Sequence, residues 1–154
     1  MNERRSEIVE LYTDGACRGN PGIGGWGVVL QTVLGESELS GVEKNTTNNR
    51  MELVAAIQGL AILTARSKIN LYTDSQYVRN GITEWILNWK NREWKTASGK
   101  PVKNKDLWIE LDLIRNQHLV DWHWVRGHDG NEGNERADAL ANQAIDRFLE
   151  GGQK

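Results

Sequence analysis

The tetrapeptide Leu-Tyr-Thr-Asp occurs twice in this chain, at residues 11–14 and again at residues 71–74. Each copy closes a segment with the alternating, β-branched and aromatic pattern of a strand, so each aspartate is expected where a strand ends. If the two strands are parallel neighbours, Asp14 and Asp74 lie side by side at one edge of the sheet. Open α/β sheets bind their ligands at that edge, and the repeat therefore predicts a site built on paired carboxylates.

The rest of the pattern predicts an α/β fold with a five-stranded mixed sheet flanked by helices. A turn at Leu34–Gly35 and a glycine-rich link at residues 19–25 indicate an antiparallel meander of the first three strands. Helices alternate with the last two strands, so we expect parallel crossovers there. The expected strands are residues 7–13, 25–31, 36–43, 69–73 and 119–125, and the expected helices are residues 49–65, 82–91, 105–117 and 134–150, the last ended by Gly151 and Gly152.

Composition excludes several classes of protein. Apolar residues make up 38% of the chain and charged residues 26%, which is typical of a globular domain rather than a disordered or collagen-like chain. Polar residues interrupt the longest apolar stretch, residues 53–65, so no membrane span is expected. The N-terminus lacks the apolar run of a secretory signal, and the single cysteine, Cys17, favours a reducing cytoplasm. With neither a linker nor a hydrophobic seam, residues 1–154 are expected to form one domain and a monomer.

The net charge of −2 hides an uneven distribution. Residues 90–105 carry six basic side chains and one acidic side chain, a net charge of +5, which leaves −7 for the remainder. A basic protrusion at roughly residues 88–105 on an acidic body could dock a polyanion, or it could be a solvated loop rich in lysine.

Two further acids accompany the repeated aspartates, and each of the four has a structural explanation of its own. Asp14 and Asp74 could be turn or N-cap residues, Glu52 stands at capping-box spacing after Asn49, and Asp138 could stabilise a helix dipole. Gathered in one place, however, four carboxylates would repel one another unless cations neutralised them. An all-oxygen set without a Cys or His cluster suits Mg²⁺ or Mn²⁺.

Four motifs in order resemble those of bacterial ribonuclease HI, the type 1 ribonuclease H family. The resemblance extends from about residue 7 to residue 148. The motifs are Thr13-Asp14-Gly15-Ala16-Cys17-Arg18-Gly19-Asn20-Pro21-Gly22, Thr47-Asn48-Asn49-Arg50-Met51-Glu52-Leu53, Thr73-Asp74-Ser75-Gln76-Tyr77-Val78, and Gly127-His128-x-Gly130 followed by Asn134-Glu135-x-Ala137-Asp138.

This resemblance implies a ribonuclease H-like fold and an endonuclease that hydrolyses the RNA strand of RNA–DNA hybrids to 5′-phosphate and 3′-hydroxyl products. It implies two Mg²⁺ ions, with Mn²⁺ as a substitute, bridged by Asp14. His128 resembles a mobile histidine assigned to proton transfer or product release; the alternative is an exposed loop histidine. The implied metal ligands are Asp14, Glu52, Asp74 and Asp138.

The resemblance also implies contacts to each strand of the hybrid. One set of residues faces the minor groove, where 2′-hydroxyls identify RNA: Cys17, Asn20, Asn48, Asn49 and Gln76. Thr47 and Asn104 match a pocket for a DNA phosphate, Tyr77 and Trp85 match a deoxyribose channel, and Trp89 and Trp94 fall in the basic protrusion. The structural alternatives are helix caps for Asn48 and Asn49, core packing for Tyr77 and Trp85, and a small buried residue for Cys17. The remaining tryptophans, Trp26, Trp108, Trp122 and Trp124, are expected in the core.

Two other functions compete with this interpretation. An integrase-like DNA strand transferase or a Holliday-junction nuclease could share the fold, but its acids would be spaced differently and it would need no minor-groove asparagines. A non-catalytic module that binds hybrids would not require four intact carboxylates.

Overall fold

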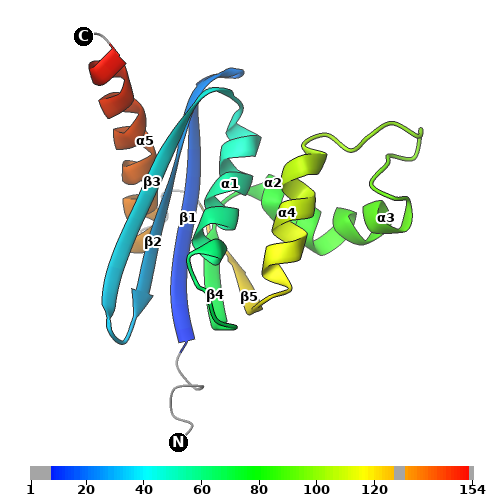
Figure 1. The fold of residues 1–154 in the computed structure, drawn as a ribbon, viewed down its shortest axis with the longest axis horizontal. Helices are drawn as coiled ribbons and strands as arrows, with labels where there is room; N and C mark the ends of the chain where they lie inside the picture. The colour runs from blue at the N-terminus through cyan, green and yellow to red at the C-terminus, as the bar shows by residue number, and fades with distance from the viewer. Residues whose placement is uncertain (1–7, 127–130, 153–154) are drawn as a thin grey trace, which may run out of the picture.

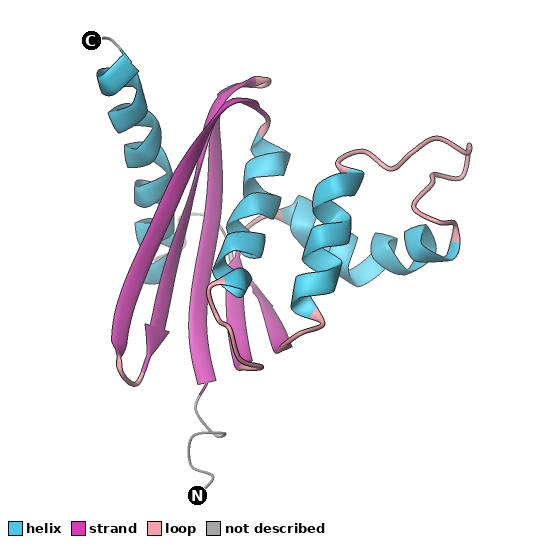
Figure 2. Ribbon diagram, viewed as in Figure 1, coloured by secondary structure: helices cyan, strands magenta, loops and turns pink. Residues whose placement is uncertain are grey.

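The computed structural model describes residues 8–126 and 131–152, which form three layers (Figure 1). A five-stranded sheet in the order β3-β2-β1-β4-β5 is the central layer. One long C-terminal helix packs on one face of the sheet, and the remaining helices lie on the other side (Figure 2). The central strand is therefore β1, which contains the first Leu-Tyr-Thr-Asp repeat. The expectation that this strand ends at Asp14 is wrong, because its pairing with β2 continues to Gly19.

The topology confirms the predicted mixed sheet. β1 pairs with β2 and β2 pairs with β3 in antiparallel fashion, whereas β1 pairs with β4 and β4 pairs with β5 in parallel. The meander and the later parallel crossovers are thus both present. The strands are β1 (Ile8–Gly19), β2 (Gly22–Thr32), β3 (Gly35–Thr46), β4 (Lys68–Thr73) and β5 (Leu119–Trp124).

Five α-helices and one π-helical turn complete the described residues. Within these residues, none of the helices is both long enough and apolar enough to cross a membrane. The helices are α1 (Asn48–Ala61), α2 (Gln76–Asn80), the π-helical turn η2 (Gly81–Trp85), α3 (Ile86–Asn91), α4 (Lys105–Arg115) and α5 (Glu132–Gly152).

The predicted link at residues 19–25 is wrong, because most of it belongs to β2. The antiparallel pairing of β1 with β2 continues to Gly19 and Gly22, which leaves only Asn20 and Pro21 between the strands. Glycine has a low intrinsic preference for strands, so the sequence pattern concealed this extension.

Two helices begin earlier than predicted because polar side chains cap them. The Ser75 hydroxyl accepts a hydrogen bond from the Val78 N–H (3.1 Å), so α2 begins well before residue 82. The Asn131 side chain accepts the Asn134 N–H (3.0 Å), and α5 begins at Glu132 instead of residue 134. The same helix runs through Gly151 and Gly152, which were expected to end it.

The main core lies between the sheet and the helices α1 and α4. Leu11 and Leu71 from neighbouring strands are fully buried there with Met51 of α1 and Trp108 of α4. Burial of such large side chains is the main favourable contribution to the folding free energy. Of the four tryptophans expected in the core, Trp108 is fully buried, and Trp26, Trp122 and Trp124 are partly buried against the core.

Gly81, the first residue of η2, is a sensitive point of this packing. An alanine Cβ there would lie 1.9 Å from the buried Trp108 ring, although the backbone at Gly81 is helical and suits alanine. We expect Gly81→Ala to lower the free energy of unfolding by about 1–3 kcal/mol, because overpacking outweighs the gain in helix propensity.

Urea denaturation checks this prediction, with Gly151→Ala as the matched control. Nothing lies within 4 Å of a Cβ at Gly151, so this change should leave stability unchanged or slightly raised. Equal stability of the two variants would contradict the proposed steric role of Gly81.

Candidate metal and nucleic-acid site

The register of β1 against β4 brings the two repeats together. Leu11 lies opposite Leu71 and Tyr12 opposite Tyr72, so the strands are paired repeat to repeat. Asp14 and Asp74 consequently occur at the same edge of the sheet, and one carboxylate oxygen of each lies within 4.8 Å of the other. Asp74 is the more exposed of the two.

Glu52 reaches this edge from the first turns of α1. Its Oε1 accepts a hydrogen bond from the Gly15 N–H (3.1 Å), which also donates to Asp14 Oδ1 (2.9 Å). A Cβ on Gly15 would lie 2.5 Å from the backbone carbon of Met51, so only glycine lets α1 approach β1 this closely. One oxygen of Glu52 therefore lies within 4.8 Å of oxygens of both aspartates.

The capping-box interpretation of Glu52 is wrong. The N-cap of α1 is Thr47, whose hydroxyl accepts the Arg50 N–H (3.2 Å). Because that cap leaves the Glu52 carboxylate free to turn inward, Glu52 is a buried residue of the acidic edge.

Asp138 of α5 lines the same cavity of about 180 Å³ as the other three acids. Its carboxylate lies close enough to Asp14 to contribute to the raised pKa of that residue. Asn142, one helical turn further on, donates to Asp138 Oδ1 (3.3 Å) and helps to orient it. The structure thus collects all four predicted carboxylates around one cavity, which is lined as well by Arg126 and Asn134.

Crowding changes the ionisation of the buried acids. Burial, followed by the negative charges of Asp74 and Asp138, raises the pKa of Asp14 to about 8. Burial and the charges of Asp14 and Asp74 likewise raise the pKa of Glu52 well above its usual value. A divalent cation among these oxygens would remove the repulsion, and an all-oxygen donor set suits Mg²⁺ or Mn²⁺.

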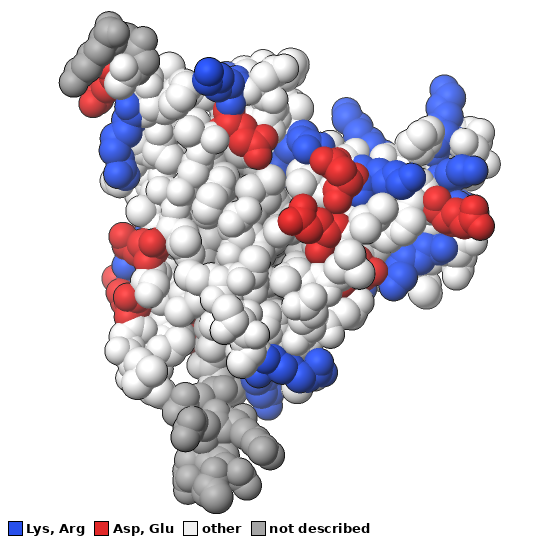
Figure 3. Space-filling view, in the orientation of Figure 1, with Lys and Arg blue, Asp and Glu red and all other residues white. Residues whose placement is uncertain are grey.

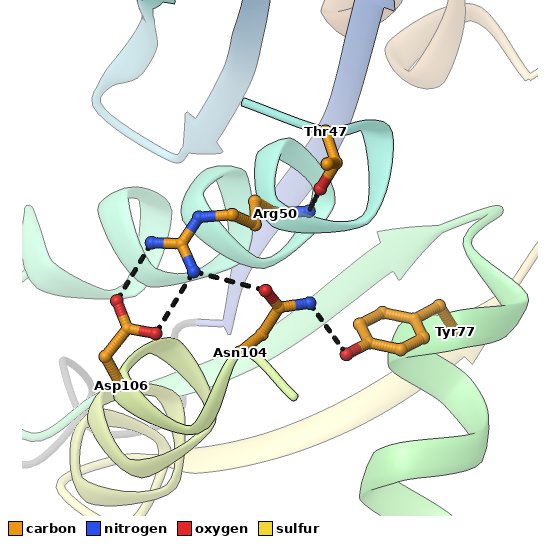
Figure 4. A network of polar contacts seen from close by, with 5 residues as sticks. All are labelled: Thr47, Arg50, Tyr77, Asn104 and Asp106. Carbon is orange, nitrogen blue, oxygen red and sulfur yellow. Dashed lines mark hydrogen bonds and ion pairs between the residues drawn. The ribbon is translucent and has the colours of Figure 1, made fainter. Parts of the chain in front are cut away.

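A second polar cluster joins Thr47 and Asn104, the two residues predicted to bind a DNA phosphate (Figure 4). Arg50 links them: its backbone N–H donates to the Thr47 hydroxyl and its Nη1 donates to Asn104 Oδ1 (3.2 Å). Asp106 holds the guanidinium through two further hydrogen bonds (3.1 and 2.9 Å). Sequence reasoning missed Arg50, although its place in the second motif, three residues after Thr47, could have indicated it.

The predicted deoxyribose residues lie beside this cluster. The Tyr77 hydroxyl accepts hydrogen bonds from Asn104 Nδ2 (3.0 Å) and Trp108 Nε1 (2.9 Å). Trp85 packs edge-on to Tyr77, with ring centroids 5.9 Å apart. Both rings are only partly buried: Tyr77 packs against the core, and Trp85 packs against Tyr77 and Trp89.

The predicted minor-groove residues are distributed over three elements. Asn20, between β1 and β2, accepts the Asn48 N–H of α1 through its side chain (3.2 Å). Cys17 is partly buried near the end of β1, and Asn48 and Asn49 are exposed in the first turn of α1. Gln76 is exposed at the start of α2. His128 lies outside the described residues, so its role stays a prediction.

The basic protrusion extends from α3 to α4 and projects from the body of the molecule (Figure 1). Lysine and arginine side chains gather along it on the face shown in Figure 3. At its base, Lys90 pairs with the buried carboxylate of Asp112 (2.9 Å). The Trp89 ring packs against both Trp94 and Trp108, so the predicted protrusion tryptophans connect the protrusion to the core.

Comparisons with known proteins agree with this fold and site. A family model described as RNase H matches residues 6–146. Curated proteins named Ribonuclease H are 56% identical in Nitrosospira multiformis, over 98% of this chain and 97% of the relative, and 62% identical in Pseudomonas putida, over 92% and 95%.

Solved structures give the same result. LC9-RNase H1, a type 1 RNase H with the type 2 active-site motif, superposes with a TM-score of 0.81 at 36% identity, covering 96% of this chain and 74% of that one. LC11-RNase H1, solved in complex with an RNA/DNA hybrid, gives 0.70 at 27% identity over 92% and 99%. The mixed sheet and its acidic edge are therefore those of a nuclease with the ribonuclease H fold. The chain belongs to the ribonuclease H family and is a hydrolase.

The raised pKa values predict how metal-free stability depends on pH. The folded protein retains a proton on Asp14 up to about pH 8, whereas the unfolded chain releases it near the usual value of 3.8. Folding therefore binds protons over this range, and stability in EDTA should fall as the pH rises from about 4 towards 8. Asp14→Asn should reduce the slope of stability against pH, and added Mg²⁺ should reduce the same slope in the parent protein.

Thermal unfolding across this pH range measures both effects. Asp121→Asn is the control, because Asp121 is exposed on β5 opposite Asn70 and does not line the carboxylate cavity. Identical slopes for the parent and the Asp14→Asn variant would contradict the proposed repulsion among the buried acids.

Proposed function

We propose that this protein is an endonuclease that hydrolyses the RNA strand of RNA–DNA hybrids, leaving 5′-phosphate and 3′-hydroxyl ends. The observation that carries the proposal is the cavity at the sheet edge, where Asp14, Glu52, Asp74 and Asp138 converge. The hybrid bound to the structural relative LC11-RNase H1 supports the choice of substrate.

The four carboxylates would hold two Mg²⁺ ions, or Mn²⁺ in their place, since an all-oxygen donor set suits these cations. Bound there, such ions would activate the attacking water and stabilise the leaving oxygen of an in-line displacement. The protein's own contribution is to hold the carboxylates in place before substrate arrives. The Gly15 N–H fixes Asp14 and Glu52 together, and Asn142 orients Asp138.

The other predicted residues would recognise the two strands. The polar cluster of Arg50, Thr47 and Asn104 is suited to a phosphate of the DNA strand, since a guanidinium and neutral donors meet there. Tyr77 and Trp85 offer apolar ring surface to deoxyribose. The side chains that would contact the minor groove are Cys17, Asn20, Asn48, Asn49 and Gln76. Through its place in the fourth motif, His128 would carry a proton or aid product release.

This function has further expected features. We propose that residues 1–154 act as one domain, as a monomer, and in the cytoplasm. Membership of the ribonuclease H family argues against a DNA strand transferase, a Holliday-junction nuclease and a non-catalytic hybrid-binding module.

Asp14→Asn should abolish cleavage of labelled hybrid in Mg²⁺ without loss of the fold, because the central carboxylate is lost and the side-chain volume is kept. The parent protein should cut hybrid, stop cutting in EDTA, and leave duplex RNA and duplex DNA intact. Gel analysis of the products, with Asp121→Asn as an active control, measures each outcome. Full activity of Asp14→Asn, or comparable cleavage of the three substrates, would refute the proposal.

The basic protrusion gives a separate prediction. Lys95, Lys100 and Lys103 are exposed and lie far in sequence from the acids, so they should bind the phosphate backbone equally in the ground and transition states. Their joint replacement by alanine should raise KM for hybrid with little change in kcat. Each lost phosphate contact should also reduce the slope of log affinity against log salt by roughly 0.9.

A charge-matched variant separates local contact from overall charge. Arg66, Lys68 and Arg147 are exposed and distant from the protrusion, so their joint replacement by alanine changes the net charge equally. The KM of this control for hybrid should be close to that of the parent. If both triple variants behave alike, the protrusion does not hold the substrate.

A further inference from the structure

A second cavity adjoins the acidic edge. It has a volume of about 460 Å³ and lies between the start of α2 and the end of β5, where its walls include Gln76, Arg79, Trp124 and Arg126. Asp74 and Arg126 line this cavity and the carboxylate cavity as well. The two cavities are therefore neighbours that share a wall.

Two arginines from different elements give the second cavity its chemical character. Arg79 belongs to α2 and Arg126 follows β5, and both side chains are exposed. Among residues 8–126 and 131–152, the salt bridges involve other basic side chains, and neither arginine takes part in one. Two exposed guanidinium groups that line one cavity beside Asp74, and form no salt bridge with the described residues, are suited to an anion, above all a phosphate.

The walls around these arginines are firmly held. Trp124 stacks on Trp122 with ring centroids 5.7 Å apart and an interplanar angle of 10°. Ser75, which also lines the cavity, is buried and caps α2. A site whose walls are ordered before binding loses less conformational entropy when its ligand arrives.

The position of the cavity indicates which strand would supply the phosphate. In the proposed function, the reacting phosphate of the RNA strand lies at the four carboxylates. A cavity that shares Asp74 and Arg126 with that centre adjoins the strand bound there, whereas the Arg50 cluster proposed for the DNA strand is built from α1 and α4.

We propose that Arg79 and Arg126 bind a phosphate of the RNA strand adjacent to the scissile phosphate and thereby position the strand over the carboxylates. This inference rests on the proposed function for the identity of the strand. Arg126 also lines the carboxylate cavity, so a phosphate bound beside this arginine would lie close to Asp74. The positive charge of Arg126 would offset the repulsion between that phosphate and the Asp74 carboxylate. The two arginines are positioning residues, since they act on a phosphate that does not react.

The test measures binding first, so that it does not depend on cleavage. Fluorescence anisotropy in EDTA gives the affinity of a labelled hybrid for the parent, for the double variant Arg79→Gln and Arg126→Gln, and for Arg66→Gln. Arg66 is an exposed arginine in the loop before β4, and its replacement should leave affinity unchanged. The double variant should bind about tenfold more weakly, since a hydrogen-bonded charge pair is lost.

Substrates in which one linkage carries no charge identify the phosphate that the arginines bind. Hybrids are made in which one methylphosphonate replaces one phosphate, at successive positions on either side of a single cleavage site. One position on the RNA strand next to that site should weaken binding to the parent but cause no further loss in the double variant, because the same contact is already missing. An equal loss in the parent and the double variant at every position, or coupling to a DNA phosphate instead, would overturn the proposal.

Two measurements keep the outcomes distinct. Urea denaturation should give the parent's stability for the double variant, because both replaced side chains are exposed and have no salt bridge within the described residues. Cleavage in Mg²⁺ is assayed separately: a parent protein that binds hybrid but never cuts it would refute the proposed function. Even in that case, the binding data would still show whether the arginines are coupled to one RNA phosphate.

Discussion

The parallel pairing of β1 with β4 is the constraint on which the site depends. It sets Leu11 against Leu71 and Tyr12 against Tyr72, and so carries Asp14 and Asp74 to one edge of the sheet. A slip of one residue would turn one strand's side chains to the opposite face, burying polar groups and exposing leucine. The buried leucines therefore enforce the register that the carboxylates need, and core packing and site geometry share one cause.

The acidic edge is a local conflict within an otherwise favourable core. Burying ionised carboxylates beside one another is energetically unfavourable. The pKa values of Asp14 and Glu52 are therefore raised, and both carboxyl groups hold their protons more tightly. Protons and divalent cations thus compete for the same oxygens, and cation binding should release protons. The close packing of α1 at Gly15 keeps the acids together despite their repulsion, because the helix is fixed by its own buried face.

The sequence predicted the features that rest on regular patterns. Alternating strands, helical arcs and the repeated tetrapeptide indicated the mixed sheet and the meeting of Asp14 with Asp74 on paired strands, whereas the joint site with Glu52 and Asp138 followed from the resemblance to ribonuclease HI. Features that rest on single side-chain contacts were not predicted. The N-cap of α1 is Thr47 and not Asn49 of the expected capping box, and α2 begins early because Ser75 caps it. Caps depend on local geometry that several polar residues could provide. The Arg50 link between Thr47 and Asn104 joins two segments distant in sequence, and no periodicity indicates such a contact.

Segregation of charge reconciles an acidic protein with a polyanionic substrate. Burial alone would raise the pKa of Asp112, but hydrogen bonds from Lys90 and Arg115 lower it, so this buried carboxylate remains charged and anchors the base of the protrusion. The lysines beyond that anchor form no salt bridge with the described residues, and their field extends into solvent. Exposed charges are screened within about 8 Å at physiological ionic strength, so a phosphate responds to the nearest side chains and hardly to the net charge of −2. Affinity for a nucleic acid is therefore set by where the basic groups stand, and the acidic body costs little as long as its acids lie more than a screening length from the strand or are neutralised by cations.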